Sequence, residues 1–303
     1  MPKIWTKICR NLLVAALAVG AVGCAPAAES DNGKPLVLTT FTVIADMVRV
    51  VGGDAVDVES ITKVGAEIHG YEPTPSDLKR AAEADLIFDN GFGLERWFEP
   101  FVSRIDVPHA VLTDGIEPIS IRIGDYAGLP NPHSWMSPMA GQRYVDNIAE
   151  ALTELVPEQA TTFAANAADY KGELQALVNE LTAVVQALPD QQRVLVTCEG
   201  AFSYLARDIG LTEGYLWPVN SDSQGTPQQI KAAIELVRDG DVPAVFCETT
   251  VNDESQRQVA RESGARFGGL LYVDSLSEAG GPVPTYLDLL RYDVELIAEG
   301  LSQ

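Results

Sequence analysis

Three histidines are the side chains in this sequence best suited to bind a metal ion. They are His69, His109 and His133, since neutral imidazole is the commonest metal ligand among side chains. His69 follows a strand-like run and precedes Thr74-Pro75-Ser76-Asp77, which is typical of a capped helix start. His133 lies in the proline-rich segment 131–138, and a rigid backbone would hold its ring ready for a ligand. A lone loop histidine is usually a surface residue, and we assign His109, in VPHAVL, to structure.

Two cysteines, Cys198 and Cys247, remain once the N-terminal segment is set aside. Each ends a hydrophobic strand-like run, and the two runs belong to successive strand–helix units. Adjacent parallel strands would bring the two thiols together, and an oxidising compartment favours their pairing. We expect a Cys198–Cys247 disulfide, with two buried free thiols as the alternative.

The first 23 residues have the layout of a secretory signal peptide. Three basic residues are followed by the apolar run 12–22, which is too short to span a bilayer as a mature helix. The run ends Ala21-Val22-Gly23-Cys24, which resembles a lipobox, although leucine is commoner at the position of Ala21. We therefore expect lipidation at Cys24 and a flexible tether over residues 24–35. Ordinary cleavage near Ala27, releasing a soluble protein, is the alternative.

The charge of the chain excludes several classes of partner. A formal net charge of −22 disfavours nucleic acids and anionic lipid surfaces, both of which bind basic faces. The chain has 303 residues, which is enough for two ordinary domains. We expect a soluble, monomeric folded part that reaches the membrane only through its N-terminal lipid.

The same order of signals occurs twice along the chain. Strand-like runs at 36–41 and 193–197 are each followed by a helical stretch, at 42–53 and 200–210. Thr-Pro tetrads at 74–77 and 226–229 then precede a helix and another strand. Corresponding points lie about 150–160 residues apart. The repeat predicts two similar α/β lobes with parallel sheets, at 36–156 and 190–303.

A single long helix is predicted between the two lobes, over residues 157–189. Prolines mark both limits, and apolar residues recur every three or four positions between them. This apolar seam comprises Phe163, Ala167, Tyr170, Leu174, Leu177, Leu181, Val184 and Leu188. The alternative is a coiled-coil dimer helix. Flanked by two α/β halves, the helix is better explained as a rigid connection that packs along both lobes.

Six segments in order resemble one known family of proteins. They are TTFTVIADMV, HGYEPTPSDLKRAAEADLIFDNGFGLERW, NPHSWMSP, VTCEGAFSYLARDIGL, WPVNSDSQGTPQQI and YVDSLSEAGGPVPTYLDLL. Together they are similar to the metal-binding lipoproteins of bacterial ABC importers, the cluster A-I solute-binding proteins, and most to the manganese/iron branch. The resemblance covers residue 36 to the C-terminus. It implies two α/β lobes joined by a long helix, one metal ion between the lobes, and no catalysis.

The resemblance implies four metal ligands in this sequence. The histidine before the YEPTPSD motif matches His69, and the histidine of the motif D-P-H-x-W-x-D-P matches His133. An acid in the segment S-E-G-x-F matches Glu199, where Cys198 replaces the usual serine. The acid of the D-S-[IL] segment matches Asp274. This chain has Asn131 and Ser137 where the second motif has acids, which puts the hydrogen bonding around His133 in question.

The chemistry of these four residues fits a divalent transition metal. Glu199 and Asp274 each follow a strand-like run, and open α/β folds bind ligands beyond the carboxyl ends of their strands. Two neutral imidazoles and two carboxylates balance a dication, and mixed nitrogen and oxygen donors suit manganese, iron or zinc. Zinc-binding relatives usually have a histidine at the third position and a long His-rich loop, which this chain lacks. Manganese (Mn2+) is therefore favoured, with Fe2+ and Zn2+ as alternatives.

The sequence predicts an extracytoplasmic solute-binding lipoprotein, in the periplasm or at the cell surface. It would deliver its metal to an ABC transporter permease with a cytoplasmic ATPase. A zinc-binding member of the same family and a metal-stabilised adhesin are the alternatives. A metallohydrolase is disfavoured, because we find no acid placed as a general base beside the four ligands.

Overall fold

The computed structural model describes residues 33–219 and 225–302. The predicted signal peptide, Cys24 and most of the predicted tether lie outside these described residues. Within them, no helix is both long enough and apolar enough to cross a membrane.

The first half is built on one four-stranded parallel sheet with the strand order β2-β1-β3-β4. Its strands are β1 (Leu36–Thr39), β2 (Asp57–Ser60), β3 (Leu86–Asp89) and β4 (His109–Val111). Its connections contain α1 (Thr42–Gly52), the 3-10 turn η1 (Gly53–Ala55), α2 (Pro75–Glu83) and α3 (Glu99–Val102). The central strands β1 and β3 are almost wholly buried, as continuous apolar runs in a covered parallel sheet should be.

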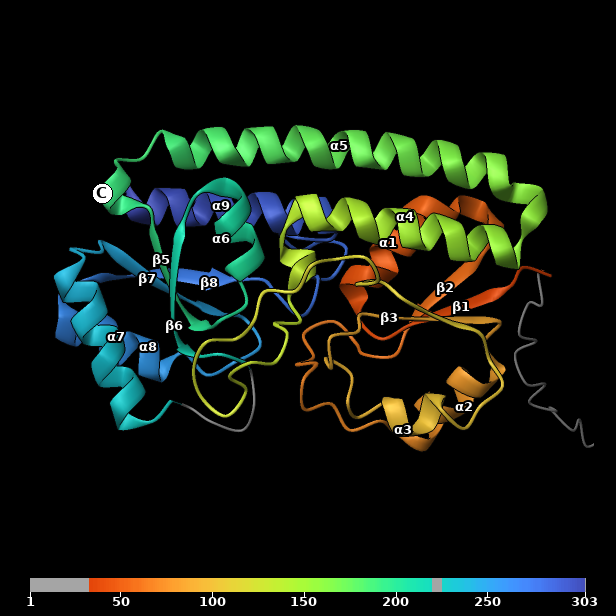
Figure 1. The fold of residues 1–303 in the computed structure, drawn as a ribbon, viewed down its shortest axis with the longest axis horizontal. Coiled ribbons are helices and arrows are strands. Elements are labelled where there is room, and N and C mark those ends of the chain that lie inside the picture. Colours follow the sequence, from red (N-terminus) through yellow and green to blue (C-terminus); the bar gives the residue numbers. More distant parts are fainter. Residues whose placement is uncertain (1–32, 220–224, 303) are drawn as a thin grey trace, which may run out of the picture. The chain divides into compact units, whose positions relative to one another are not determined.

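The second half contains two parallel strand pairs, β5-β6 and β7-β8. The strands are β5 (Val194–Glu199), β6 (Thr212–Trp217), β7 (Ala244–Glu248) and β8 (Arg266–Leu271). The helices are α6 (Ser203–Ile209), α7 (Pro227–Asp239), α8 (Glu254–Ser263) and α9 (Tyr286–Leu301). Strands β5 and β7 lie side by side, so the two pairs form one layer without a continuous ladder (Figure 1).

Between the halves the chain forms η2 (Ser134–Met136), α4 (Pro138–Leu155), η3 (Pro157–Gln159), α5 (Ala160–Gln186) and η4 (Asp190–Gln192). The predicted long helix is therefore present, and its α-helical part is α5. Residues 157–159 form a 3-10 turn instead, and the helix ends before Pro189 because proline disfavours α conformation in the residue before it.

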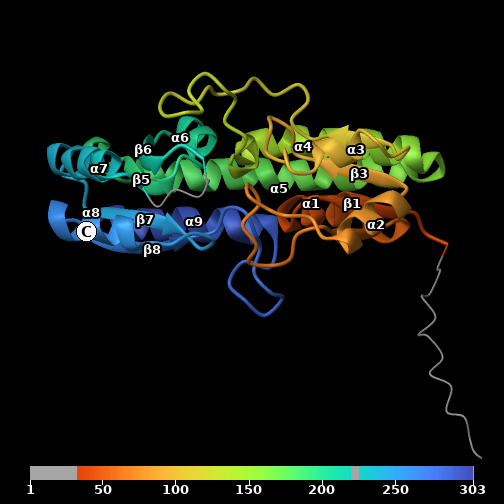
Figure 2. The same cartoon turned by 90° about the horizontal axis from the view of Figure 1, so that it is seen from below.

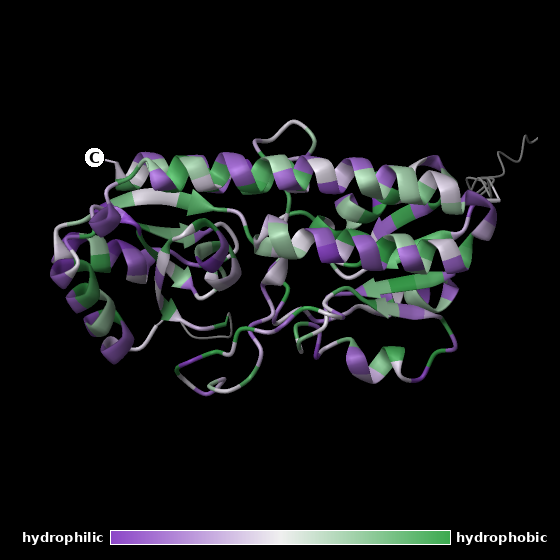
Figure 3. Cartoon of the chain, turned by 45° about the horizontal axis from the view of Figure 1, so that its top comes forward, coloured by the Kyte–Doolittle hydropathy of each residue, from purple (hydrophilic) through white to green (hydrophobic). Residues whose placement is uncertain are grey.

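Helix α5 runs along both halves and packs on helices of its own chain (Figure 1). Seven residues of the predicted seam lie within α5, and six of them are buried. The seventh, Val184, is not, and its neighbour Val185 is buried instead. Helices α4, α1, α9 and α6 contact α5, so its apolar face is covered without a second chain. The alternative of a coiled-coil dimer helix is therefore not needed. Figure 3 shows the hydropathy along the helices and strands.

Both Thr-Pro tetrads form the predicted capping boxes. The side chains of Thr74 and Thr226 each accept a hydrogen bond from the third residue of the helix, whose side chain accepts one in return. These boxes fix where α2 and α7 begin. In each half, therefore, the chain leaves a loop and enters a helix at a point encoded by its local sequence.

A long segment, residues 112–133, connects β4 to η2 and crosses from the first half to α6 (Figure 2). Ile119 donates its backbone N–H to the Tyr204 hydroxyl at 3.0 Å, and that hydroxyl donates to the backbone oxygen of Asn131 at 2.8 Å. The segment is thus fastened to α6 just before it reaches His133.

Candidate metal centre

Four side chains from distant parts of the sequence meet where the two halves face each other. His69 lies in the loop after β2, His133 directly before η2, Glu199 at the end of β5, and Asp274 after β8. One donor atom from each residue lies within 4.8 Å of the other three. The structure thus brings together all four residues that the sequence singled out as ligands.

Three of the four donor atoms are spaced as the ligands of one ion would be. His69 Nε2 lies 3.0 Å from His133 Nε2, and Glu199 Oε1 lies 3.2 Å and 3.4 Å from these two nitrogens. Ligands placed tetrahedrally at about 2.1 Å from a metal ion are about 3.4 Å apart. Such an ion therefore fits among these atoms with little rearrangement.

His69 is held by its own loop and is the one member of the group at the protein surface. Glu67 accepts hydrogen bonds from the backbone N–H of His69 at 2.6 Å and of Gly70 at 2.9 Å. Trp97 Nε1 donates to the backbone oxygen of Ile68 at 2.8 Å. The His69 side chain is 6% exposed, whereas those of His133 and Glu199 are fully buried. Access to the group is therefore on the His69 side.

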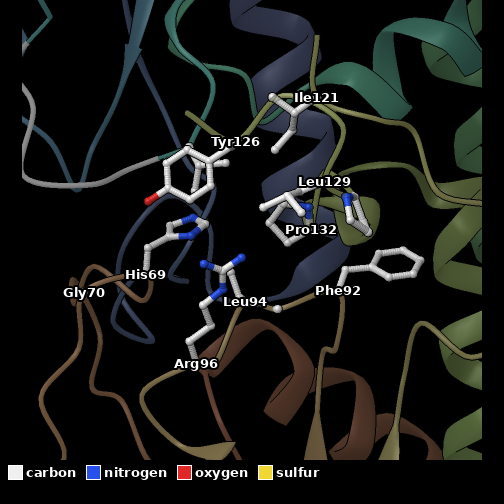
Figure 4. Close-up of a pocket in the computed structure, with 12 residues that line it drawn as sticks. His69, Gly70, Phe92, Leu94, Arg96, Ile121, Tyr126, Leu129 and Pro132 are labelled. Atoms are coloured by element: carbon white, nitrogen blue, oxygen red, sulfur yellow. The ribbon is translucent and has the colours of Figure 1, made fainter. Parts of the chain in front are cut away.

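A cavity of about 160 Å³ opens beside His69 (Figure 4). Its polar side chains are His69, Arg96 and Tyr126, and its remaining wall is largely apolar or glycine. The guanidinium carbon of Arg96 lies 5.9 Å from the centre of the Tyr126 ring. The cavity thus adjoins His69, the one residue of the four whose side chain is partly exposed.

His133 is oriented by Asn131. Asn131 Oδ1 accepts hydrogen bonds from the His133 backbone N–H at 3.0 Å and from the ring Nδ1 at 2.8 Å. Because Nδ1 carries the proton in this bond, the lone pair of the neutral ring lies on Nε2, which faces the other donors. His133 is thus prepared to act as a metal ligand through Nε2.

Burial keeps both imidazoles uncharged. It lowers the pKa of His133 to about 3. Burial, together with the neighbouring His133, holds the pKa of His69 well below its usual range. Neutral imidazole is the form that binds metal, so no proton has to leave either ring near pH 7.

Glu199 is supported from behind by a second carboxyl group, that of Glu248. Both Glu248 oxygens lie 3.2 Å from the backbone nitrogen of Glu199, whose N–H they accept. Glu248 is fully buried, and burial followed by the charge of Glu199 raises its pKa well above the usual range. Its oxygens face the Glu199 backbone, so Glu248 fixes the end of β5.

Asp274 is positioned by contacts from both halves. Thr250 donates its hydroxyl to Asp274 Oδ2 at 2.9 Å. Trp135, two residues after His133, donates its ring N–H to the backbone oxygen of Val273 at 3.1 Å. The hydroxyl of Ser275 accepts the backbone N–H of Gly65, in the His69 loop, at 2.7 Å. The segments carrying His69, His133 and Asp274 are therefore hydrogen-bonded to one another.

The remaining residues singled out by the sequence lie outside this group. His109 is exposed on β4 and is not one of the four converging residues, as expected for a structural role. In the structure Cys198 and Cys247 form a disulfide that joins β5 to β7 next to Glu199 and Glu248.

Sequence reasoning missed Glu248, Thr250 and the role of Trp135. A signal for Glu248 was present, because the pair Cys-Glu ends both β5 and β7. An acid after the second cysteine therefore lies beside the acid after the first. No comparable signal marks Thr250, whose position depends on how the loop after β7 folds.

Comparison with known proteins agrees with this architecture. The model of the family "ZnuA: Zinc-uptake complex component A periplasmic" matches residues 37–300. The iron-binding protein YfeA of Yersinia pestis is 51% identical over 276 residues, covering 90% of this chain and 89% of YfeA. The manganese-binding lipoprotein MntA of Halalkalibacterium halodurans is 33% identical, covering 98% of this chain and 99% of MntA.

A solved structure shows the same fold. The Mn-bound periplasmic metal binding protein from Candidatus Liberibacter asiaticus is 36% identical, with a TM-score of 0.82, and it covers 88% of this chain and 100% of its own. The family model spans almost the whole described part of the chain, and the similarity to YfeA extends over nearly the full length of both proteins. The chain therefore belongs to the ZnuA family of periplasmic uptake components.

Proposed function

We propose that this protein captures one divalent manganese ion, or ferrous iron, through His69, His133, Glu199 and Asp274. The observation that carries the proposal is the convergence of two neutral imidazoles and two carboxylates, with donor separations of 3.0–3.4 Å among three of them. Two carboxylates balance the charge of a dication, so the loaded site is neutral inside a buried environment.

Family membership makes the chain the substrate-binding component of a metal ABC transporter. Its cargo would pass to a membrane permease driven by an ATPase. We further propose that Cys24 carries a lipid anchor, that the domains follow the limits predicted above, and that the protein acts as a monomer. The mature protein would then begin at Cys24, on the extracytoplasmic side of the membrane.

The relatives and the donor set both support manganese or iron. YfeA is named as iron-binding and MntA as manganese-binding. A carboxylate such as Glu199 can bind through one or two oxygens, which suits the larger coordination numbers of these ions, whereas zinc prefers four ligands. Zinc is the second candidate, because divalent affinities rise from manganese toward copper, with zinc also high.

The closed site favours transport over catalysis. A hydrolytic metal site needs an open coordination position and a positioned general base. Here three of the four donors are fully buried. The nearby acid Glu248 faces the Glu199 backbone instead of the centre of the group. These features support binding and release of the ion without chemistry on a bound substrate.

Titration of chelator-stripped protein with Mn2+ tests this function. We expect one tight site per chain. Asp274→Ala should weaken binding by at least tenfold, because it removes a ligand and half of the compensating charge. His109→Ala, the matched control, should leave the affinity unchanged. Uptake of manganese should fall in a strain lacking the gene. Absence of tight binding, or a damaging effect of His109→Ala alone, would overturn the assignment.

A further inference from the structure

Asn131 has an amide side chain where the family motif D-P-H-x-W-x-D-P has an aspartate. The residue is 3% exposed. Its side chain bonds in two directions. Oδ1 accepts from the backbone and ring of His133. Nδ2 donates to the backbone oxygen of Gly200 at 2.6 Å and to the Ser203 hydroxyl at 3.2 Å.

The orientation of this amide follows from its partners. The oxygen of Gly200 is a carbonyl, which only accepts hydrogen bonds, so the amide nitrogen must face it. The amide oxygen then faces His133. A single planar group thereby connects one proposed ligand, His133, to the residue that follows another, Glu199.

We propose that Asn131 is a positioning residue that locks His133 to Glu199 across the two halves, and that this role requires an amide. The proposal rests on the proposed function, since it assigns those two side chains as ligands. An aspartate at 131 could accept from His133 equally well. It has no N–H for Gly200, and it would instead place two oxygens against each other at the 2.6 Å separation seen here.

Other contacts of the same segment support a rigid unit. The Tyr204 hydroxyl on α6 donates to the backbone oxygen of Asn131 at 2.8 Å. On the other side of His133, Trp135 donates to the backbone oxygen of Val273, the residue before Asp274. His133 is therefore fastened toward both carboxylate ligands, while His69 lies on a separate loop at the surface. Asn131 is the link to Glu199.

Asn131→Ala and Asn131→Asp separate the two directions of bonding. Alanine removes both, whereas aspartate keeps the acceptor for His133 and loses the donor to Gly200. Asn147→Asp is the matched control, because Asn147 Nδ2 also donates to two backbone oxygens, of Leu112 at 2.9 Å and Asp114 at 3.0 Å, away from the proposed ligands.

Hydrogen exchange of the metal-free full chain is the first measurement. Both Asn131 variants should exchange about tenfold faster over residues 199–206, the order expected when a buried hydrogen bond is lost. Amides of α7 should be unchanged, which shows that the variants are folded. This measurement involves no metal, so it is independent of the extra charge that aspartate would offer to a cation.

The second measurement is the visible absorption spectrum of the Co2+-loaded protein, which reports the arrangement of ligands. Both Asn131 variants should change the spectrum, and Asn131→Ala should weaken Co2+ binding about 10- to 100-fold. Asn147→Asp should match the wild type in both measurements. If Asn131→Asp behaves like wild type while Asn131→Ala does not, orienting His133 is the whole role and the inference is wrong. Wild-type behaviour of both variants overturns it too. If the wild type binds no metal, the proposed function fails instead.

Discussion

Gln256 offers a test of how the second half holds its two strand pairs together. No strand ladder joins β5 to β7 in the described residues, yet the two strands lie side by side. The fully buried Gln256 side chain on α8 donates to the backbone oxygens of Val196 at 3.0 Å and Phe246 at 2.9 Å. One amide therefore bridges β5 and β7 where the backbone does not.

We expect Gln256→Met to lower the free energy of unfolding by about 2–4 kcal/mol. Two buried carbonyl groups lose their hydrogen-bond partner, at a cost of about 1–3 kcal/mol each. Part of this is offset, because Gln256 Oε1 is itself buried with no hydrogen-bond partner in the part of the chain that the structure describes, and methionine removes this oxygen. For a folded chain of this size the change corresponds to a drop in Tm of about 4–8 °C.

Urea denaturation of the metal-free protein measures this effect. Gln258→Met, two residues along the same helix, is the matched control, because the one hydrogen bond of the Gln258 side chain among the described residues goes to the exposed Glu262 side chain. The control should stay within about 0.5 kcal/mol of wild type. If Gln256→Met is as stable as the control, the disulfide, the hydrogen bonds from Glu199 to Glu248 and the packing hold β5 to β7 without Gln256, and this account of the strand pairs is refuted.

Three further predictions concern metal choice, the disulfide and pH. Glu199→His should weaken Mn2+ binding while retaining Zn2+ binding, because an imidazole gives one donor atom and favours tetrahedral geometry; titration with both metals measures the ratio, and an unchanged ratio contradicts the assignment. Replacing Cys198 and Cys247 by serine should cost about 4 kcal/mol in urea denaturation, from their separation of 49 residues, and non-reducing mass analysis of the native chain should find no free thiol at either position. Burial raises the pKa of Glu213 to about 7, whereas its pKa in the unfolded chain is about 4.5. The free energy of unfolding that Glu213 contributes is therefore complete below pH 4.5 and is lost as the pH rises through 7. Between pH 5.5 and 7.5 that loss is about 2 kcal/mol, and it should be absent in Glu213→Gln; equal pH dependence of the two proteins would exclude it.

Local signals in the sequence predicted most of the elements around the site. Capping boxes at Thr74 and Thr226 mark helix starts because their hydrogen bonds involve residues only three apart. The seam of α5 follows from helical periodicity, and its burial on the same chain was the favoured prediction. The ligand set was predicted from a family resemblance, since neither Glu199 nor Asp274 differs locally from an ordinary residue at a strand end.

Several contacts that depend on tertiary structure were not predicted, although the Cys198–Cys247 disulfide was. The sequence indicated that Asn131 and Ser137 change the hydrogen bonding around His133, but it did not predict which residues they bond to. Ser137 caps α4 and donates to Asp208 on α6, and Asn131 reaches Gly200; both partners lie about 70 residues away. The division of the second half into two strand pairs, bridged by Gln256, likewise depends on contacts that no local pattern encodes.

Anomalous diffraction at the manganese edge, from crystals of the full folded chain soaked in Mn2+, tests the central claim most directly. We predict one strong peak per chain, about 2.0–2.4 Å from His69 Nε2, His133 Nε2 and oxygens of Glu199 and Asp274. A crystal that takes up Mn2+ only elsewhere, or shows no peak among these four side chains, would contradict it.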